Sequence, residues 1–461
     1  MLDEPLAGNP ICNPVAILSL HRLMAQGRVL LKSAFLKNVF TVMFGTAVAQ
    51  VIGLALMPVV SRIFTPAHFG VFGSFTAVLG VFGAGATLQY SQALMLPKEE
   101  IEAAQLFVLS CLATSGVASL CLLYNLVFPG YMLGMMKTPG MTWLLWLLPL
   151  AVFVNGLNQA LQAWCIRRKA FRKTSGSQIV RSVFATGSQV IMGLGGLGGC
   201  GLVGGSILGD TAATITLCGT LPREDYRRFW AGWHGSQLWQ TARKFYDFLA
   251  YATPQNVLNA ASQGIPVLLL AHYFGAAVAG SYAVCIRMLQ TSMNLVLNAL
   301  RQVLFQKFSE SHNHGQKLFP LFFKMTIGLF CVAAIPCFIG FVWSPNLFSI
   351  VLGKEWGEAG LYARWLIVWH GLSFCNVPSV LLGRILRQQR NLLLFDVVLL
   401  IVRTTSMLVG CCFWDPLKTI ILFSFVGAVY NVIIIIWIGY LTFQADGKSC
   451  IHNQPNNLTR Y

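Results

Sequence analysis

Charged residues are scarce in this chain of 461 residues: Asp, Glu, Lys and Arg make up only 10%, whereas 56% of the residues are hydrophobic. The mean hydropathy is +0.66. A soluble domain of this length needs a larger charged fraction, so the composition excludes one. The apolar runs also lack the alternating pattern of about ten residues that an outer-membrane β-barrel requires. The chain is therefore predicted to be an all-α, polytopic membrane protein.

Groupings of metal ligands are also missing. The 13 cysteines form no C-x-x-C pair and no Cys/His cluster with ligand spacing, and most lie inside apolar runs as small packing residues. The Gly-rich run 193–205 follows no strand and precedes no Lys, so it is read as a turn with close helix packing and not as a phosphate loop. We expect neither a metal nor a cofactor.

Twelve apolar runs are long enough, at about 20 residues, to cross a bilayer as helices. An even number of spans places both ends of the chain on the same side of the membrane. The twelve runs are residues 39–60, 69–91, 103–128, 141–165, 175–198, 199–221, 248–271, 278–304, 319–341, 359–383, 391–413 and 417–441.

The distribution of basic residues indicates on which side of the membrane the two ends of the chain lie. If the N-terminus is inside, the inner segments hold 22 Lys and Arg residues and the outer loops hold four. This is the asymmetry of the positive-inside rule, so both termini are predicted to be cytoplasmic. The same asymmetry accounts for the formal net charge of +17, and binding of nucleic acid is not needed to explain it.

The longest connection, residues 222–247, is polar, basic and internal, and it divides the spans into six plus six. The predicted parts are an inner extension (1–37), an N-lobe (38–221), a cytoplasmic linker (222–247), a C-lobe (248–441) and a cytoplasmic tail (442–461). An internal echo supports the division: "PVVSRIFTPAHFGVF" (58–72) and "PVLLLAHYFGAAVAGSY" (266–282) both run from a proline into Gly-x-aromatic. Such repetition predicts two pseudo-symmetric six-helix lobes around a central cavity.

The span 278–304 carries polar residues on one face: Arg287, Thr291, Asn294, Asn298 and Arg301. An arginine at the centre of a membrane helix costs roughly 2.5–3.5 kcal/mol. Arg287 lies about two to three turns from the outer end of its span, so a cavity or a substrate is favoured for it. Arg301 is equally well placed to line the cavity or to reach the inner headgroups from a helix end.

Shorter polar features occur on two other spans. Asn256, Asn259 and Gln263 form a stripe on the span 248–271. Arg181 in the span 175–198 lies within two turns of the inner surface, where it can line the cavity or extend to the headgroups.

Three more charges lie inside predicted spans. Asp396 and Arg403 are seven residues apart on one face of the span 391–413, and each either faces the cavity or is neutralised by a neighbouring helix. Asp210 is either a functional charge or a polar residue satisfied by Thr211 or Thr214. Asp396 and Asp210 are the candidates for coupling to an ion, because they are the carboxylates deepest in the spans.

Several stretches together resemble one family of membrane proteins. They are "GTAVAQVIGLALMPVVSRIFTPAHFGVFGSF" (45–75), "ALMLPKEEIEAAQL" (93–106), "IRRKAFRK" (166–173), "FGAAVAGSYAVCIRML" (274–289) and "NLFSIVLGKEWGEAGLYARWL" (346–366). The chain resembles, from about residue 38 onward, the O-antigen-type lipid-linked oligosaccharide flippases of the multidrug/oligosaccharidyl-lipid/polysaccharide exporter superfamily. It departs from the family in reading Gln89-Tyr90-Ser91 where Arg-Tyr-Glu is frequent, which puts any ion pair or coupling role there in doubt.

The resemblance implies a two-lobed fold of twelve to fourteen helices with a cationic central cavity. It also implies that the protein moves an undecaprenyl-pyrophosphate-linked oligosaccharide across the bacterial cytoplasmic (inner) membrane by alternating access, for O-antigen, capsule or exopolysaccharide assembly. A polysaccharide polymerase and a chain-length regulator are possible partners besides the lipid-linked oligosaccharide and the bilayer. Arginine forks suit a pyrophosphate, since they can bond its oxygens bidentately. Arg287 and Arg403 are the foremost candidates, followed by Arg301 and Arg181. The sugar head would then meet the Asn, Gln and Thr stripes, which include Asn259, Asn294 and Asn298.

Two other functions are weighed against this one. A cation-coupled multidrug exporter would share the fold, but it usually needs a carboxylate deep in the first spans, and the first two spans have none. An O-antigen polymerase would need catalytic groups in a large outer loop. The largest predicted outer loop, about 342–358, offers only Lys354, Glu355 and Glu358. We therefore expect a transporter without catalytic residues.

Overall fold

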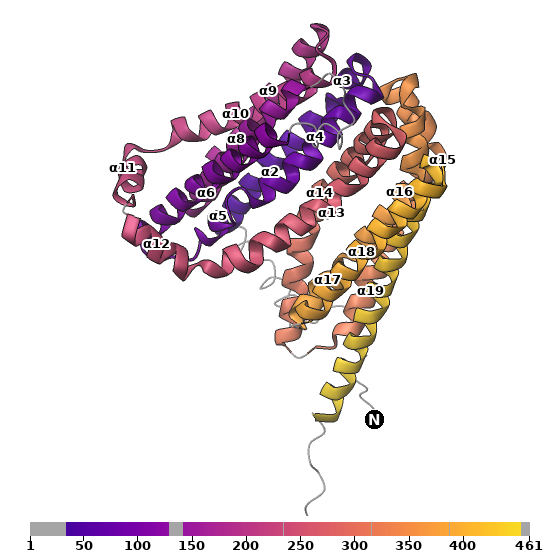
Figure 1. The fold of residues 1–461 in the computed structure, drawn as a ribbon. Coiled ribbons are helices and arrows are strands. Elements are labelled where there is room, and N and C mark those ends of the chain that lie inside the picture. The colour runs from indigo at the N-terminus through magenta and orange to yellow at the C-terminus, as the bar shows by residue number, and fades with distance from the viewer. Residues whose placement is uncertain (1–33, 129–141, 234, 315, 387, 453–461) are drawn as a thin grey trace, which may run out of the picture.

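All regular structure in the described residues is helical, which confirms the predicted all-α class (Figure 1). The computed structural model describes residues 34–128, 142–233, 235–314, 316–386 and 388–452. The predicted extension 1–37 lies outside these ranges except for its last four residues. The predicted tail begins inside the last helix, which continues to His452.

The helices follow one another with short connections. In the first half they are α2 (Ala34–Ala55), α3 (Met57–Ile63), α4 (Pro66–Gly85), α5 (Tyr90–Ala93), α6 (Glu100–Val127), α8 (Thr142–Arg167), α9 (Phe171–Leu194) and α10 (Gly198–Thr220). The linker forms α11 (Arg223–Ala231) and α12 (Gly235–Lys244), followed by a π-helical turn (Phe248–Ala252). The second half has α13 (Thr253–Phe274), α14 (Ala276–Asn313), α15 (Leu318–Leu352), a 3₁₀ turn (Lys354–Trp356), α16 (Gly357–Cys375), α17 (Val377–Ile385), α18 (Gln389–Phe413) and α19 (Pro416–His452).

Local sequence explains several helix ends. Pro66 occupies the first turn of α4, where its missing N–H costs nothing, and the Thr65 backbone N–H donates to His68 Nδ1 at 3.4 Å. The chain leaves α13 at Gly275 (φ +91°) and α15 at Gly353 (φ +117°). These φ values suit glycine because it has no Cβ.

Each of the twelve predicted runs falls on helical structure, although the runs 39–60, 69–91 and 359–383 each cover two helices. The expected count of spans is met only in part. Within the described ranges, nine helical segments are long and apolar enough to cross a membrane. The runs that fall short lie in α8, α9 and α14. In α9 and α14 the physical reason is that rows of polar side chains lower the mean hydropathy, such as Gln178, Arg181 and Ser182 on α9. In α8 the side chains of Thr142, Trp143 and Leu145 lie outside the described residues, so the described part of its apolar stretch is shorter.

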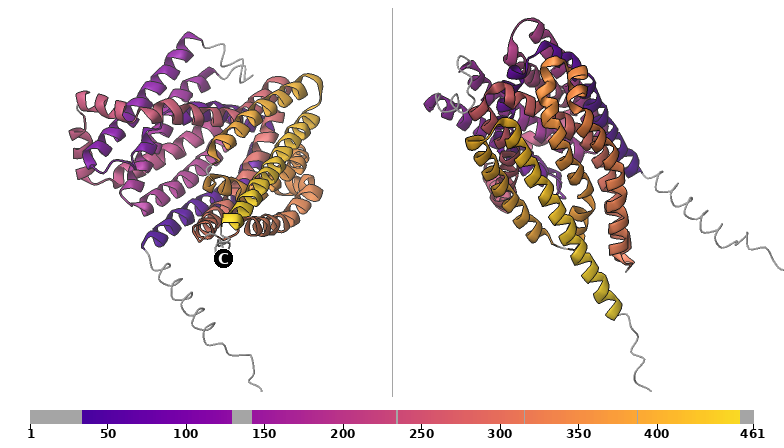
Figure 2. Two further views of the ribbon diagram at one scale, coloured as in Figure 1. Left: turned by 90° about the horizontal axis from the view of Figure 1, so that it is seen from below. Right: turned by 90° about the vertical axis from the view of Figure 1, so that its right-hand side faces the viewer.

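The two halves of the chain are joined mainly through α4, which packs against both α13 and α14. Smaller contacts join α2 to α14 and α3 to α15. Figure 1 shows α3 beside α15 at one end of the molecule, whereas α12 and α19 lie on opposite sides at the other end. In the right-hand view of Figure 2, α19 again extends beyond the neighbouring helices at its C-terminal end.

The contact between α4 and α14 is reciprocal. A Cβ on Gly70 would stand 1.8 Å from the carbonyl oxygen of Ala276, and a Cβ on Gly280 would stand 1.8 Å from that of Pro66. The two glycines belong to the two copies of the Gly-x-aromatic echo in the sequence. The backbones of the two halves therefore touch directly where the repeated segments cross.

Side-chain contacts between α3, α4 and the 3₁₀ turn after α15 also join the two halves, at the same end of the molecule as the α4–α14 contact. Ser61 Oγ donates to the Leu352 carbonyl at 3.0 Å, and Trp356 Nε1 donates to the Ser61 carbonyl at 3.0 Å. The ring of Trp356 also meets Phe69 edge to face, with centroids 5.2 Å apart. Because Trp356 is 1% exposed, the junction is closed by a fully buried aromatic side chain.

Hydrogen bonds hold the linker helices α11 and α12 against the first half. Asp225 of α11 is buried and accepts hydrogen bonds from Trp164 Nε1 at 3.1 Å and Arg168 Nη2 at 2.6 Å. Gln105 of α6 accepts from Thr241 Oγ1 of α12 at 2.6 Å. A charge-assisted bond to a buried carboxylate is stronger than a neutral one, so Asp225 is the main anchor of the linker.

Candidate functional site

A cavity with a volume of about 730 Å³ lies between the two halves. Helices α2, α4, α9, α13 and α14 contribute most of its wall. Among the described residues that line it, Arg181 and Arg287 are charged and none is acidic. The other polar side chains of the lining are Thr46, Gln50, Thr76, Gln178, Ser182, Thr186, Gln189, Ser206, Gln263, Gln290, Thr291 and Asn294.

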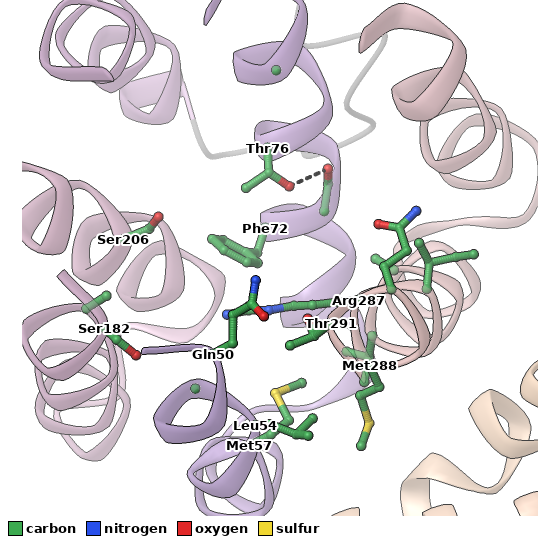
Figure 3. A pocket seen from close by; sticks show the side chains of 18 of the residues that line it. Gln50, Leu54, Met57, Phe72, Thr76, Ser182, Ser206, Arg287, Met288 and Thr291 are labelled. Atoms are coloured by element: carbon green, nitrogen blue, oxygen red, sulfur yellow. Dashed lines mark hydrogen bonds between the residues drawn. The ribbon is translucent and has the colours of Figure 1, made fainter. Parts of the chain in front are cut away.

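Arg287 extends from α14 across this cavity toward Gln50 and Phe72 (Figure 3). Its guanidinium carbon lies 5.9 Å from the centroid of the Phe72 ring, within the range of a cation–π contact. The side chain is exposed to the cavity, and no carboxylate in the described ranges pairs with it. Gln50 Oε1 is buried without a hydrogen-bond partner. The cavity thus contains a positive charge that no described protein group neutralises.

Arg181 lines the same cavity but has a partner. Its Nε forms an ion pair with Asp210 Oδ1 of α10, and the Asp210 side chain is only 8% exposed. Thr214 donates to the Asp210 backbone carbonyl at 2.8 Å and does not satisfy the carboxylate. Asp210 therefore compensates Arg181, and Arg287 carries the net charge of the cavity.

The polar stripe on α14 enters the cavity only in part. Thr291 and Asn294 line it together with Arg287. Arg301, almost two turns beyond Asn294, is exposed and is not part of the lining. The side chain of Asn298 lies outside the described residues.

The stripe on α13 is divided in the same way. Gln263 lines the cavity. Asn259 is exposed outside the lining and accepts a hydrogen bond from Gln263 Nε2 at 3.4 Å. Asn259 can therefore orient Gln263 without forming part of the cavity wall.

Arg403 and Asp396 are not part of this cavity's lining. The Arg403 guanidinium carbon lies between two rings, 4.0 Å from the Trp369 centroid and 4.1 Å from the Phe423 centroid. Its Nε and Nη2 are buried without a hydrogen-bond partner. Asp396 Oδ1 accepts from Tyr430 Oη at 2.5 Å. Both charges therefore interact with neighbouring helices of the second half, and an aromatic pair surrounds Arg403.

Sequence reasoning missed most of the polar face of α9. Gln178, Ser182 and Gln189 lie beside Arg181 in the cavity wall. Their positions relative to Gln178 are i+4 and i+11, with Arg181 at i+3, so helical periodicity was the signal that could have found them.

No group of three or more His, Cys, Asp or Glu side chains that could hold a metal ion occurs in the part of the chain that the structure describes.

A helical membrane protein with a polar, basic cavity between two halves has the architecture of a transporter. Its fold is similar to a multidrug resistance MATE family transporter of the MOP superfamily in an inward-facing conformation (TM-score 0.61, 13% identity, 88% of this chain and 95% of that chain). It is equally similar to the lipid II flippase MurJ in an inward closed conformation (0.61, 12%, 90% and 93%). A MATE transporter in complex with MaD5 also matches (0.54, 12%, 89% and 97%).

The sequence gives the family. A family model described as "Polysaccharide biosynthesis protein" matches residues 59–360, more than half of the chain. The chain belongs to this family, and its fold is that of the MOP-superfamily transporters, which confirms the resemblance found in the sequence. No curated protein sequence matches the chain.

Proposed function

We propose that this protein is a flippase that moves an undecaprenyl-pyrophosphate-linked oligosaccharide from the inner to the outer leaflet of the bacterial cytoplasmic membrane. The observation that carries the proposal is the unpaired Arg287 in a cavity whose described lining holds no acidic residue. A pyrophosphate is a compact anion, and an arginine in a partly dehydrated cavity can bond two of its oxygens at once. Family membership and the similarity to a lipid II flippase support the same substrate class.

In this proposal all twelve helical runs cross the membrane and both termini are cytoplasmic. The junction at Gly70, Gly280 and Trp356 then lies at the outer ends of the helices. The cavity is closed on the outer side and receives its substrate from the inner side, as an alternating-access transporter does before translocation. Spans α9 and α14 are more polar than the rest because they form walls of aqueous cavities and not only lipid-facing surface.

The arginines have different roles in this account. Arg287 attracts the pyrophosphate, and Arg181 is held by Asp210 and adds hydrogen-bond donors more than net charge. Arg403 stabilises the second half through Trp369 and Phe423, so its contribution to binding is indirect. Asp210 remains a candidate for ion coupling because its carboxylate is paired with a charged residue of the cavity lining, Arg181.

A cation-coupled multidrug exporter is the alternative that shares this fold. A cationic drug would need an acidic or aromatic cavity, and Arg287 would repel it. A polymerase of surface polysaccharide would need catalytic groups that the described cavity lining does not offer. The partners proposed from the family, a polymerase and a chain-length regulator, would act on the product after translocation.

Deletion of the gene in its host tests the proposal. We expect undecaprenyl-linked oligosaccharide to accumulate on the inner leaflet and the surface glycan to disappear, with both effects reversed by the native gene. A multidrug exporter would instead leave the surface glycan unchanged while sensitivity to cationic drugs rises. That second outcome would refute the proposed substrate.

A further inference from the structure

A second cavity, of about 570 Å³, lies where α4 breaks into α5, beside α8 and α13. Its wall contains no charged residue among those that the structure describes. It is unusually rich in side-chain amides. The polar residues that line it are Gln89, Ser91, Gln92, Gln159, Gln162 and Asn256.

The break between α4 and α5 is held in a strained conformation. Leu88 (φ +47°) and Gln89 (φ +59°) are both left-handed although neither is glycine. This conformation costs roughly 1–2 kcal/mol per residue because Cβ approaches the following carbonyl. Gln89 is nevertheless buried, and its Nε2 donates to the Ala84 carbonyl at 2.7 Å. The left-handed backbone at Leu88 and Gln89 thus places the Gln89 amide in the wall of the second cavity.

The orientation of three of these amides follows from their hydrogen bonds. Gln89 Nε2, Gln159 Nε2 and Asn256 Nδ2 donate to the backbone carbonyls of Ala84, Gly83 and Ala252 at 2.7, 3.1 and 2.9 Å. A backbone carbonyl can only accept, so each NH₂ group must be the end that faces it. The three amide oxygens receive no hydrogen bond from the described residues, and the cavity therefore offers acceptors.

Neutral acceptors select a particular kind of ligand. An anion would be repelled by a set of carbonyl oxygens, and a cation would lack the carboxylate it needs for full compensation. A neutral molecule with many O–H or N–H donors can satisfy all three oxygens. Sugars and N-acetylated sugars have this chemistry.

The second cavity adjoins the central one. Gln178 of the central cavity donates through Nε2 to Gln162 Oε1 of the second cavity at 3.1 Å. Gly80 and Ala84, one turn apart on α4, line the central and the second cavity respectively. A helical turn advances about 5.4 Å, so a chain of sugars that begins beside Arg287 can continue into the second cavity.

We propose that this second cavity is a binding site for neutral sugar residues of the cargo, which the amide oxygens of Gln89, Gln159 and Asn256 recognise through donated O–H and N–H groups. The inference rests on the proposed function and refines it: the central cavity binds the pyrophosphate, and the second cavity binds sugar residues of the glycan. The uncharged residues of the second cavity then determine which sugars the protein binds.

Binding to the full-length protein in lipid nanodiscs tests the inference with two probes. One is undecaprenyl pyrophosphate, and the other is the same lipid bearing a neutral N-acetylhexosamine disaccharide. We expect the native protein to bind the glycosylated probe more tightly. Asn256→Leu and Gln159→Leu should each weaken binding of the glycosylated probe about three- to tenfold, as expected for one lost hydrogen bond, and leave the bare probe unaffected.

The two substitutions differ in how many other hydrogen bonds of the protein they remove. Asn256 bonds only to the Ala252 carbonyl four residues before it in the chain, so Asn256→Leu is the cleaner change. Gln159→Leu also deprives Asn155 Oδ1 of a donor at 2.7 Å. Gln306→Leu is the matched control, because Gln306 is exposed on α14 and bonds only to Glu310.

The outcomes separate the two ideas. Equal binding of both probes by the native protein, or glycosylated-probe binding that neither Asn256→Leu nor Gln159→Leu weakens, overturns the sugar site and leaves the flippase proposal intact. Failure of the native protein to bind either probe contradicts the flippase proposal and the sugar site with it.

Discussion

Gly70→Ala is expected to open the contact that joins the two halves at α4 and α14. The added methyl would stand 1.8 Å from the carbonyl oxygen of Ala276. The obstructing atom belongs to the backbone, so no side-chain rotation can relieve the clash. The reciprocal contact of Gly280 with Pro66 would be pulled apart at the same time.

The size of the effect follows from this geometry. Cβ contacts essentially never fall below 3.0 Å, so the helix ends must part by at least 1.2 Å, the difference between 3.0 and 1.8 Å. Overpacking of this kind typically costs about 1–3 kcal/mol, and here the cost applies only to the state in which the two helices touch. The equilibrium should therefore shift about 5- to 150-fold toward the state that is open on this side.

Accessibility of the cavity measures that shift. A cysteine at Thr76, which lines the cavity, should react faster with a membrane-impermeant thiol reagent added outside intact cells when Gly70→Ala is present. Cys412 is exposed and should be removed as Cys412→Ser to lower the background. Gly116→Ala is the matched control, since a Cβ there meets no atom within 4 Å.

The reasoning would be refuted by equal labelling of Thr76→Cys in the Gly70→Ala and Gly116→Ala proteins at equal expression. That result would mean that the α4–α14 contact does not close the outer side of the cavity.

The remaining predictions concern topology, the linker and coupling. Cysteines engineered in 342–358 should react with an impermeant reagent outside intact cells and those in 222–247 should not; outside labelling of 222–247 would overturn the orientation. Asp225→Asn should lower stability on the order of 1–3 kcal/mol, seen as a lower Tm in detergent, because the buried group that accepts from three donors loses its charge and one of its two acceptor oxygens; an equal loss in the exposed control Glu224→Gln would contradict this. Asp210→Asn should alter the pH or sodium dependence of transport, and unchanged dependence would exclude it as the coupling residue.

The sequence alone predicts those features that depend on the energetic cost of a charge in the membrane or on helical periodicity. An arginine deep in a membrane helix needs an aqueous or charged environment. This argument favoured a cavity for Arg287, and the structure places Arg287 in the cavity lining. Helical spacing likewise brought Thr291 and Asn294 to the same wall. The helix positions could be predicted because apolar length alone identifies a span.

The same reasoning could not distinguish Arg403 from Arg287. Periodicity tells which residues share a face, but it does not tell which helix covers that face. Arg403 meets Trp369 and Phe423 from two other helices, and Arg181 meets Asp210 from the next helix. These partners depend on tertiary packing, which a single sequence does not encode in a readable pattern.

The break after α4 was also beyond sequence reasoning. The run 69–91 was predicted as one continuous span, because Leu88 and Gln89 have no tendency to adopt a left-handed conformation. Tertiary contacts impose it, as the bond from Gln89 to Ala84 illustrates. The second cavity depends on this break, although the row Asn155, Asn158, Gln159 and Gln162 on α8 gave a helical signal for one of its walls.

Transport of undecaprenyl-pyrophosphate-linked oligosaccharide in proteoliposomes tests the central claim most directly. Arg287→Ala should abolish transfer to the leaflet where an added glycosidase can reach the glycan, and Arg287→Lys should retain part of it, since lysine keeps the charge and loses the fork. Arg301→Ala, on the same helix but outside the cavity lining, should transport at close to the native rate. Transport by Arg287→Ala at the native rate, in protein that is folded and fully incorporated, would contradict the account.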